Sequence, residues 1–135
     1  MTITLHTKDG AKTAQMVLSG NHQFISDIIE SEGGEDLGPS PHDLYDAALA
    51  SCKALTLMWY ANKKGIAIEH IETKIERDDS QERQGVYKLR ATLHIRGTFT
   101  DQEFDQLKAV AEKCPIHKLM TSVVTEITTK MERIQ

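Results

Sequence analysis

Polar and apolar residues alternate in short runs over residues 1–30. The segments MTITLHT, AKTAQMVLSG and NHQFISDII each follow the period of two that is typical of half-buried strands. Gly20-Asn21 separates the last two segments and is a pair that favours a turn. We therefore predict three antiparallel strands in this region, followed by a mobile loop at residues 30–40, which are acidic and glycine-rich.

The strongest pattern in the chain predicts a long helix over residues 41–64. Ser40 is a suitable N-cap, Asp43 lies where the acid of a capping box belongs, and Gly65 suits the position after the last turn. The middle of this helix, AALASCKALTLMWYA, is apolar nearly all round, so it must be covered on most sides. One small sheet can cover only one face, and we therefore expect a second copy of the chain to cover another.

The remaining pattern predicts a hairpin, two further helices and a final strand. Residues 66–78 and 85–99 alternate as an antiparallel pair does, with a polar loop between them. Residues 100–114 have apolar positions at helical spacing, and CPIHKLMTS is predicted to form a short helix after them. The segment VVTEITTKMERI is predicted to close the chain as a strand. This order of elements indicates the α+β class.

Length and charge narrow the class of protein further. A chain of 135 residues is predicted to form a single domain, 1–135, and its net charge of −4 argues against nucleic-acid binding. No apolar run approaches the roughly 18 residues of a membrane span, and the N-terminal segment lacks the apolar region of a secretory signal. We therefore expect a cytoplasmic protein, in which two cysteines are reactive or merely buried thiols.

The candidate chemistry depends on these two cysteines. Cys52 lies in the middle of the apolar helix and is either an inert packing group or a reactive thiol; its neighbour Lys53 does not share its helix face. Cys114 stands directly before Pro115. If Pro115 opens a short helix, Cys114 is the N-cap, with His117 in the same turn, and the helix dipole favours a thiolate there. By this reasoning Cys114 is the more acidic thiol, unless it merely fills a bend.

Three kinds of site would use such residues. A structural zinc site needs four ligands with short spacings, which Cys52, Cys114, His42 and His117 do not show. A papain-like cysteine–histidine pair needs an orienting group and an oxyanion site, and neither is evident. A dithiol that cycles through a disulfide needs its two Cα atoms within about 7 Å. The residues alone leave this third kind of site open.

Two stretches resemble motifs of a known family. SPHDLYDAALASCKAL (40–55) is similar to a proline-containing entry into a central helix that carries a cysteine. AEKCPIHKLM (111–120), followed by VVTEIT, is similar to a cysteine–proline helix start. In this order they resemble the OsmC/Ohr family of organic hydroperoxide reductases. The resemblance implies an OsmC/Ohr-type α+β fold, with antiparallel sheets wrapped around a long central helix in an intertwined homodimer.

The same resemblance implies a cysteine-based peroxidase chemistry. Cys52 matches the peroxidatic thiol, which would reduce an organic hydroperoxide and become a sulfenic acid, and Cys114 matches the resolving thiol. An external dithiol, such as a lipoyl group on a protein, would reduce the disulfide, and no metal, haem or other cofactor is implied. Leu55, Met58 and Trp59 are candidate lining of an apolar pocket, and alternatively belong to the core.

The chain departs from the family at the groups that activate the first thiol. In the family an arginine in the N-terminal strands, held by a nearby carboxylate, supplies a cation. Here the first arginine is Arg77, and His42 stands at the matched carboxylate position, with Asp43 beside it. Because a mid-helix cysteine cannot rely on a helix end, we expect Cys52 to need a group from elsewhere. His117 or a basic group of the partner chain would supply it.

Two functions follow from this reading. The first is a thiol-dependent organic hydroperoxide reductase for oxidative-stress defence, which uses Cys52 and Cys114, with His42, Asp43 and His117 as candidate supporting residues. The alternative is a protein on the same scaffold that binds a small apolar ligand and has weakly reactive cysteines, since a shared fold does not carry a shared activity.

Overall fold

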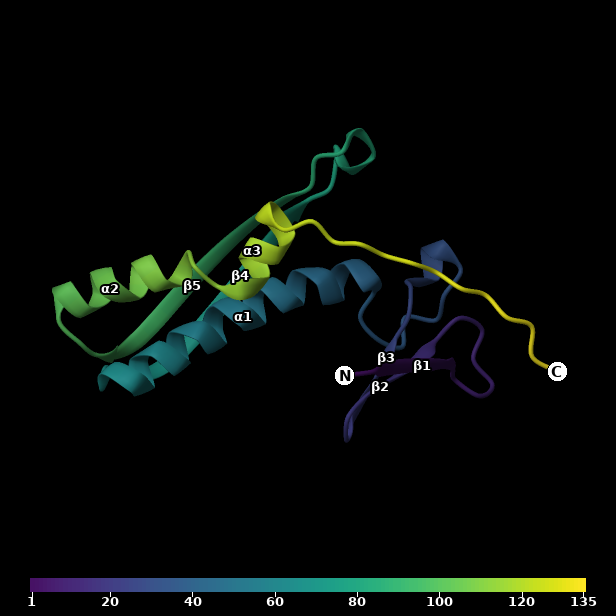
Figure 1. Cartoon of the computed structure of the whole chain (residues 1–135), viewed down its shortest axis with the longest axis horizontal. Coiled ribbons are helices and arrows are strands. Elements are labelled where there is room, and N and C mark those ends of the chain that lie inside the picture. The colour runs from purple at the N-terminus through teal and green to yellow at the C-terminus, as the bar shows by residue number, and fades with distance from the viewer. The chain divides into compact units, whose positions relative to one another are not determined.

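Helix α1, Pro41–Lys64, is the longest element of the computed structural model, which describes residues 1–135 (Figure 1). The Asp43 N–H donates to Ser40 Oγ and the Ser40 N–H donates to the Asp43 carboxylate, each over 3.1 Å. At the other end, Gly65 has a φ of 70°, which lies in the left-handed region that glycine adopts without strain. The predicted capping box and both helix bounds are therefore confirmed.

The chain forms two compact units, Met1–Ala48 and Leu49–Gln135, and α1 contributes residues to both. The first unit contains a three-stranded antiparallel sheet of order β1-β2-β3, as predicted. Its strands are β1 (Ile3–Thr7), β2 (Gln15–Ser19) and β3 (His22–Ser26). The turn between the last two strands contains Gly20 at a φ of 59°, in agreement with the predicted turn.

Asp27, just after β3, organises the loop that follows. Its carboxylate accepts hydrogen bonds from the Thr13 hydroxyl and from the N–H groups of Ile28, Glu35 and Leu37. These bonds, the Thr13 hydroxyl first, hold the pKa of the Asp27 carboxyl below its ordinary value of 3.8, although burial opposes them. The loop predicted to be mobile is thus tied at several points to one buried carboxylate.

Replacing Asp27 by asparagine is expected to lower the stability of the protein at neutral pH. Because the folded-state pKa lies below the unfolded one, the ionised carboxylate stabilises the fold at pH values above the unfolded pKa. This contribution is lost as the pH falls through the folded-state pKa. Urea unfolding at several pH values should therefore show a deficit for Asp27→Asn that shrinks in acid. The exposed Asp9→Asn provides the control, and an equal, pH-independent deficit in both variants would contradict the prediction.

The second unit contains the predicted hairpin and two helices. Strands β4 (Ala67–Asp78) and β5 (Lys88–Thr98) pair antiparallel, in agreement with the prediction. Helix α2 (Asp101–Ala111) begins with a capping box between Thr100 and Glu103, which is also confirmed. Helix α3 (Pro115–Ser122) follows after a short turn.

The core of this unit lies between the helices and one face of the hairpin. Leu57 and Ala61 of α1, Ile66 after it and Leu107 of α2 are buried together. Residues of both strands pack against this cluster, and a register shift between Ile68 and His70 brings Ile71 to the same face as Ile68: Ile68, Ile71, Leu93 and Ile95. The hairpin therefore has one apolar face and one solvated face, as its alternating sequence predicted.

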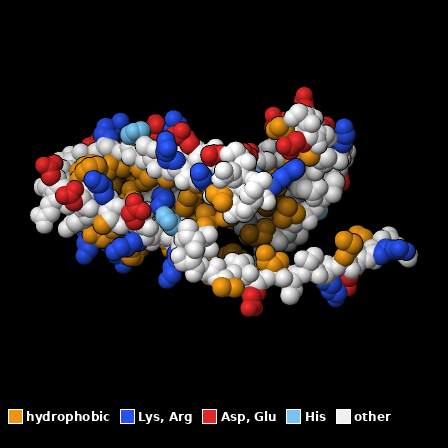
Figure 2. Space-filling view, turned by 90° about the horizontal axis from the view of Figure 1, so that it is seen from above, with side chains coloured by type: hydrophobic (Ala, Val, Ile, Leu, Met, Phe, Trp, Pro, Cys, Tyr) orange, Lys and Arg blue, Asp and Glu red, His pale blue; other side chains and the backbone are white.

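The predicted C-terminal strand is wrong for this chain. Residues 123–135 form neither helix nor strand, and they pair with neither sheet. Figure 2 shows hydrophobic side chains between charged ones along this extended segment. Alternation makes a segment compatible with a sheet, but a strand forms only where the backbone groups of another strand are available to pair with it.

No helix, α1 included, combines the length and hydropathy required to span a bilayer.

Candidate functional site

Cys114 is the N-cap of α3, and Pro115 is its first helical residue, as predicted. Proline fits this position because its missing N–H would have had no partner in the helix. The His117 N–H donates to Cys114 Sγ over an N···S distance of 3.4 Å. The thiol thus takes the place that a serine or aspartate side chain commonly fills at a helix start.

Cys52, from the middle of α1, reaches the same turn. The Ile116 N–H donates to Cys52 Sγ over 3.5 Å, and Cys52 is near enough to Cys114 to raise the pKa of that thiol. Both cysteines are free thiols, Cys52 partly exposed and Cys114 only 1% exposed. Two cysteines far apart in sequence are therefore brought together at the start of one helix, which the residues alone left open.

The helix end that assists Cys52 belongs to α3. We expected a mid-helix cysteine, far from the ends of its own helix, to need a cation or a hydrogen-bond donor from elsewhere, and the Ile116 N–H of α3 is such a donor. The N-terminal turn of α3 presents its unpaired N–H groups to Cys52 as well as to Cys114. One turn therefore supplies hydrogen-bond donors, and the positive end of a helix dipole, to both sulfurs.

The expectation of an acidic Cys114 also needs correction. Burial raises the pKa of the Cys114 thiol above its ordinary value of 9.0, and the neighbouring Cys52 raises it further. The N–H of His117 and the charge of Lys53 act in the opposite direction but do not compensate. An N-cap position stabilises a thiolate, but burial of the sulfur destabilises its negative charge. At Cys114 this desolvation is the larger effect.

Lys53 is the residue that the sequence reasoning missed. Its side chain is buried, with 6% exposed, and Nζ donates to Ala111 O over 2.7 Å and contacts His117 Nδ1 over 3.1 Å. We had set it aside because it does not share the face of Cys52. A signal was present, because Leu49, Lys53, Leu57 and Ala61 are spaced by four residues, on one helix face. A lysine within an otherwise buried apolar stripe must find polar partners.

His42 and Asp43 lie in the first turn of α1, within the first unit. The Asp43 carboxylate caps its own helix, as described above, and His42 is exposed. A supporting role for either residue stays a prediction. The zinc alternative finds no matching geometry, because no three His, Cys, Asp or Glu side chains are grouped so that they could hold a metal ion.

Two of the three residues predicted to line a pocket are at the surface. Leu55 is 64% exposed and Trp59 is 61% exposed, whereas Met58 is partly buried. Lys63 Nζ lies 5.2 Å from the centre of the Trp59 ring. Leu55 and Trp59 are therefore not part of the core of this chain. With Cys52 they occupy positions i, i+3 and i+7, so the three form one exposed stripe of α1.

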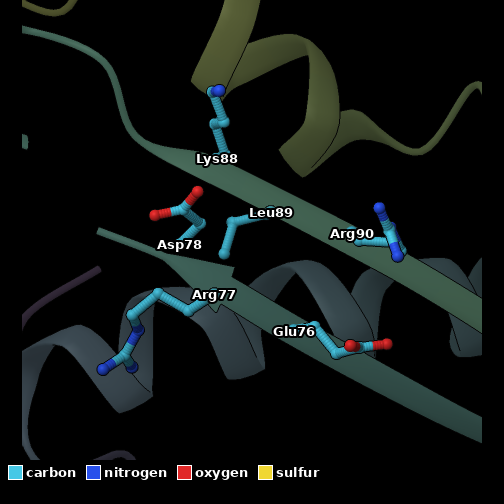
Figure 3. A pocket seen from close by; sticks show the side chains of 6 residues that line it. All are labelled: Glu76, Arg77, Asp78, Lys88, Leu89 and Arg90. Carbon is cyan, nitrogen blue, oxygen red and sulfur yellow. The ribbon is translucent and has the colours of Figure 1, made fainter. Parts of the chain in front are cut away.

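A separate hollow lies where the hairpin approaches its loop. It is lined by acidic and basic side chains with one apolar residue, from both strands: Glu76, Arg77, Asp78, Lys88, Leu89 and Arg90. Glu76 is opposite Arg90 and Asp78 is opposite Lys88 in the strand register. Figure 3 shows the Lys88 and Arg77 side chains directed away from each other. Two of the three cations are opposite a carboxylate, and the third, Arg77, is opposite Leu89 and directed away from Lys88, so we assign no ligand to this hollow.

The sequence and the fold were compared with known proteins. The sequence profile of the family described as OsmC-like protein matches residues 33–130. No curated protein matches the sequence significantly.

Three solved structures share the fold. An osmotic-stress and detoxification response protein of Psychrobacter arcticus has a TM-score of 0.73 and 19% identity, covering 90% of this chain and 89% of that one. An OsmC-like protein of Mycoplasma pneumoniae has a TM-score of 0.70 and 20% identity, covering 90% and 87%. The organic hydroperoxide resistance protein OhrB of Bacillus subtilis has a TM-score of 0.55 and 24% identity, covering 90% and 92%. Since the profile spans most of the chain, the protein belongs to the OsmC-like family.

Proposed function

We propose that this protein is a thiol-dependent organic hydroperoxide reductase that works through Cys52 and Cys114. The observation that carries the proposal is the first turn of α3, whose N–H groups donate to both sulfurs. Two free thiols at the start of one helix are suited to a cycle between dithiol and disulfide. A family with organic hydroperoxide resistance proteins among its structural relatives supports the same chemistry.

The difference in exposure assigns the two thiols different tasks. Cys52 is partly exposed and accepts the Ile116 N–H, so a hydroperoxide can reach a sulfur that already has a donor beside it. Cys114 is almost wholly buried, and burial raises its pKa, so it remains a protonated thiol in the resting protein. Cys52 is therefore the peroxidatic thiol and Cys114 the resolving thiol.

The proposed cycle balances without a metal or other cofactor. The Cys52 thiolate attacks the terminal oxygen of ROOH, the O–O bond breaks, and the leaving alkoxide takes a proton to become the alcohol ROH. Cys114 then attacks the sulfur of the Cys52 sulfenic acid. The S–S bond forms, the S–O bond breaks, and the hydroxide combines with the proton from Cys114 to give water. A dithiol, for example a lipoyl group on a protein, reduces the disulfide and becomes a disulfide itself.

The substrate class follows from the surface beside Cys52. The exposed stripe of Cys52, Leu55 and Trp59 provides an apolar side chain three positions after the thiol and an aromatic one seven positions after it. An apolar group R on the hydroperoxide would contact these side chains, and hydrogen peroxide has no such group. We propose that a second copy of the chain covers the stripe in a homodimer and closes the pocket, with Met58 at its edge.

One equivalent of cumene hydroperoxide is expected to convert the reduced protein into a form with an intrachain Cys52–Cys114 disulfide. The reason is that both sulfurs accept N–H groups of the same helix turn, so little rearrangement separates sulfenic acid from disulfide. Free thiols are blocked after brief exposure, and disulfide-linked peptides are identified by mass spectrometry. Hydrogen peroxide in the same amount is the matched oxidant and should react more slowly. Two unmodified thiols after long exposure would contradict the proposal, and the search would turn to a small apolar ligand.

A further inference from the structure

Lys53 ties three helices together around the thiol pair. It belongs to α1, its Nζ donates to Ala111 O at the end of α2, and it contacts His117 Nδ1 in the first turn of α3. An ammonium group at Nζ has only donors to offer, and the Ala111 carbonyl can only accept. These two contacts flank the turn that contains Cys114, so the lysine fixes both sides of the resolving thiol.

We propose that Lys53 is a positioning residue for the resolving step: its ammonium group holds the turn between α2 and α3 and supplies the positive charge that a Cys114 thiolate requires. This inference rests on the proposed function, because it concerns the second half of the same cycle. Lys53 would supply a cation in a chain that lacks the family's arginine. Unlike that arginine, Lys53 acts on the resolving thiol Cys114, and it belongs to α1, the helix that carries Cys52.

The surroundings of Cys114 favour this role. The titratable groups that face it are Cys52 and Lys53 from α1 and His117 from α3, whereas α2 contributes the Ala111 carbonyl. Lys53 is the cation in this set, and its charge lowers the pKa of Cys114 against the effects of burial and of the Cys52 thiol. When Cys114 gives up its proton to attack the sulfenic acid, the negative charge forms in a buried place. A fixed ammonium group nearby stabilises that charge without reorganisation of solvent.

Stability alone does not explain a buried lysine at this position. The stripe Leu49, Lys53, Leu57, Ala61 is otherwise apolar, and replacing a buried charged group by a well-packed apolar one is often neutral or stabilising. Methionine has a stem of similar length and would fill the same space. If replacing Lys53 changes the ionisation of Cys114 or slows disulfide closure but does not lower stability, the charge acts on the thiol.

The test compares Lys53→Met, Lys53→Gln and Lys53→Arg, with the exposed Lys113→Met as control. In a Cys52→Ser background, ionisation of Cys114 is followed by thiolate absorbance as a function of pH. We expect the titration to move to higher pH in the Met and Gln variants, and to stay near the parent in Lys53→Arg and Lys113→Met. In proteins that retain Cys52, closure of the disulfide after a hydroperoxide pulse should slow several-fold at neutral pH in the Met and Gln variants and recover as the pH is raised.

The Gln variant separates charge from hydrogen bonding, because its amide can still donate to Ala111 O, and it replaces the Met variant if that does not fold. An unchanged titration in a folded Lys53→Gln protein would overturn the proposal, as would an equal shift in Lys113→Met. The titration requires no hydroperoxide. If the wild-type protein forms no disulfide, the proposed function fails while the Cys114 titration still decides whether Lys53 controls this thiol.

Discussion

Replacing Cys52 by serine is expected to abolish hydroperoxide reduction, with a loss of at least roughly a thousandfold, the scale seen when a covalent nucleophile is removed. The hydroxyl of serine cannot provide the polarisable anion that attacks the O–O bond. Turnover of cumene hydroperoxide with a small dithiol as reductant measures the loss. Ser51→Ala, an exposed change at the adjacent residue, is the matched control and should keep full activity.

Cys114→Ser should give a different defect. The first half of the cycle remains, so one equivalent of hydroperoxide is consumed and a sulfenic acid accumulates on Cys52, where a cyclic dione reagent can trap it. Catalytic turnover with the dithiol should fall, because the resolving thiol is absent. Full activity in the Cys52→Ser protein, or a sulfenic acid trapped on Cys114 in place of Cys52, would contradict the assigned order of the two thiols.

The secondary structure could be predicted wherever a local signal determines it. The capping boxes at Ser40 and Thr100, the glycine after α1 and the proline at the start of α3 each satisfy or remove backbone groups within one turn. Such signals need no distant partner, so the sequence alone contains them. The hairpin was equally clear, because its two strands alternate and lie close together in the chain.

The features that the residues alone left open or that we missed depend on distant partners. The meeting of Cys52 with the first turn of α3 joins residues 64 apart in sequence, so no spacing rule indicates it, and only the family resemblance paired the two cysteines. The C-terminal segment alternates as a strand does, but it pairs with neither of the chain's two sheets, β1-β2-β3 and β4-β5. Lys53 was the exception, since its place in the stripe of every fourth residue was visible in the sequence. It was missed because we compared it with its neighbour Cys52 and not with Leu49 and Leu57.

We expect the wild-type protein to be a homodimer in solution, and the double variant Leu55→Glu, Trp59→Glu to be monomeric. Both side chains are more than half exposed in the single chain, and they extend from the proposed peroxidatic thiol along one face of α1. Leaving such large apolar groups in water costs about 1.5–3 kcal/mol each. A charged group at each position should therefore raise the Kd of the dimer by at least roughly a thousandfold.

Sedimentation velocity over a range of concentrations measures the effect, and circular dichroism shows that the variant retains its helices. Val86→Glu supplies the control, because Val86 is also an exposed apolar residue but precedes β5 in the hairpin loop and lies outside the α1 stripe. If the protein stays dimeric with both α1 substitutions, the stripe is not part of the dimer interface. The apolar side chains beside Cys52 would then face solvent in the working protein, and the preference for organic hydroperoxides would need another source.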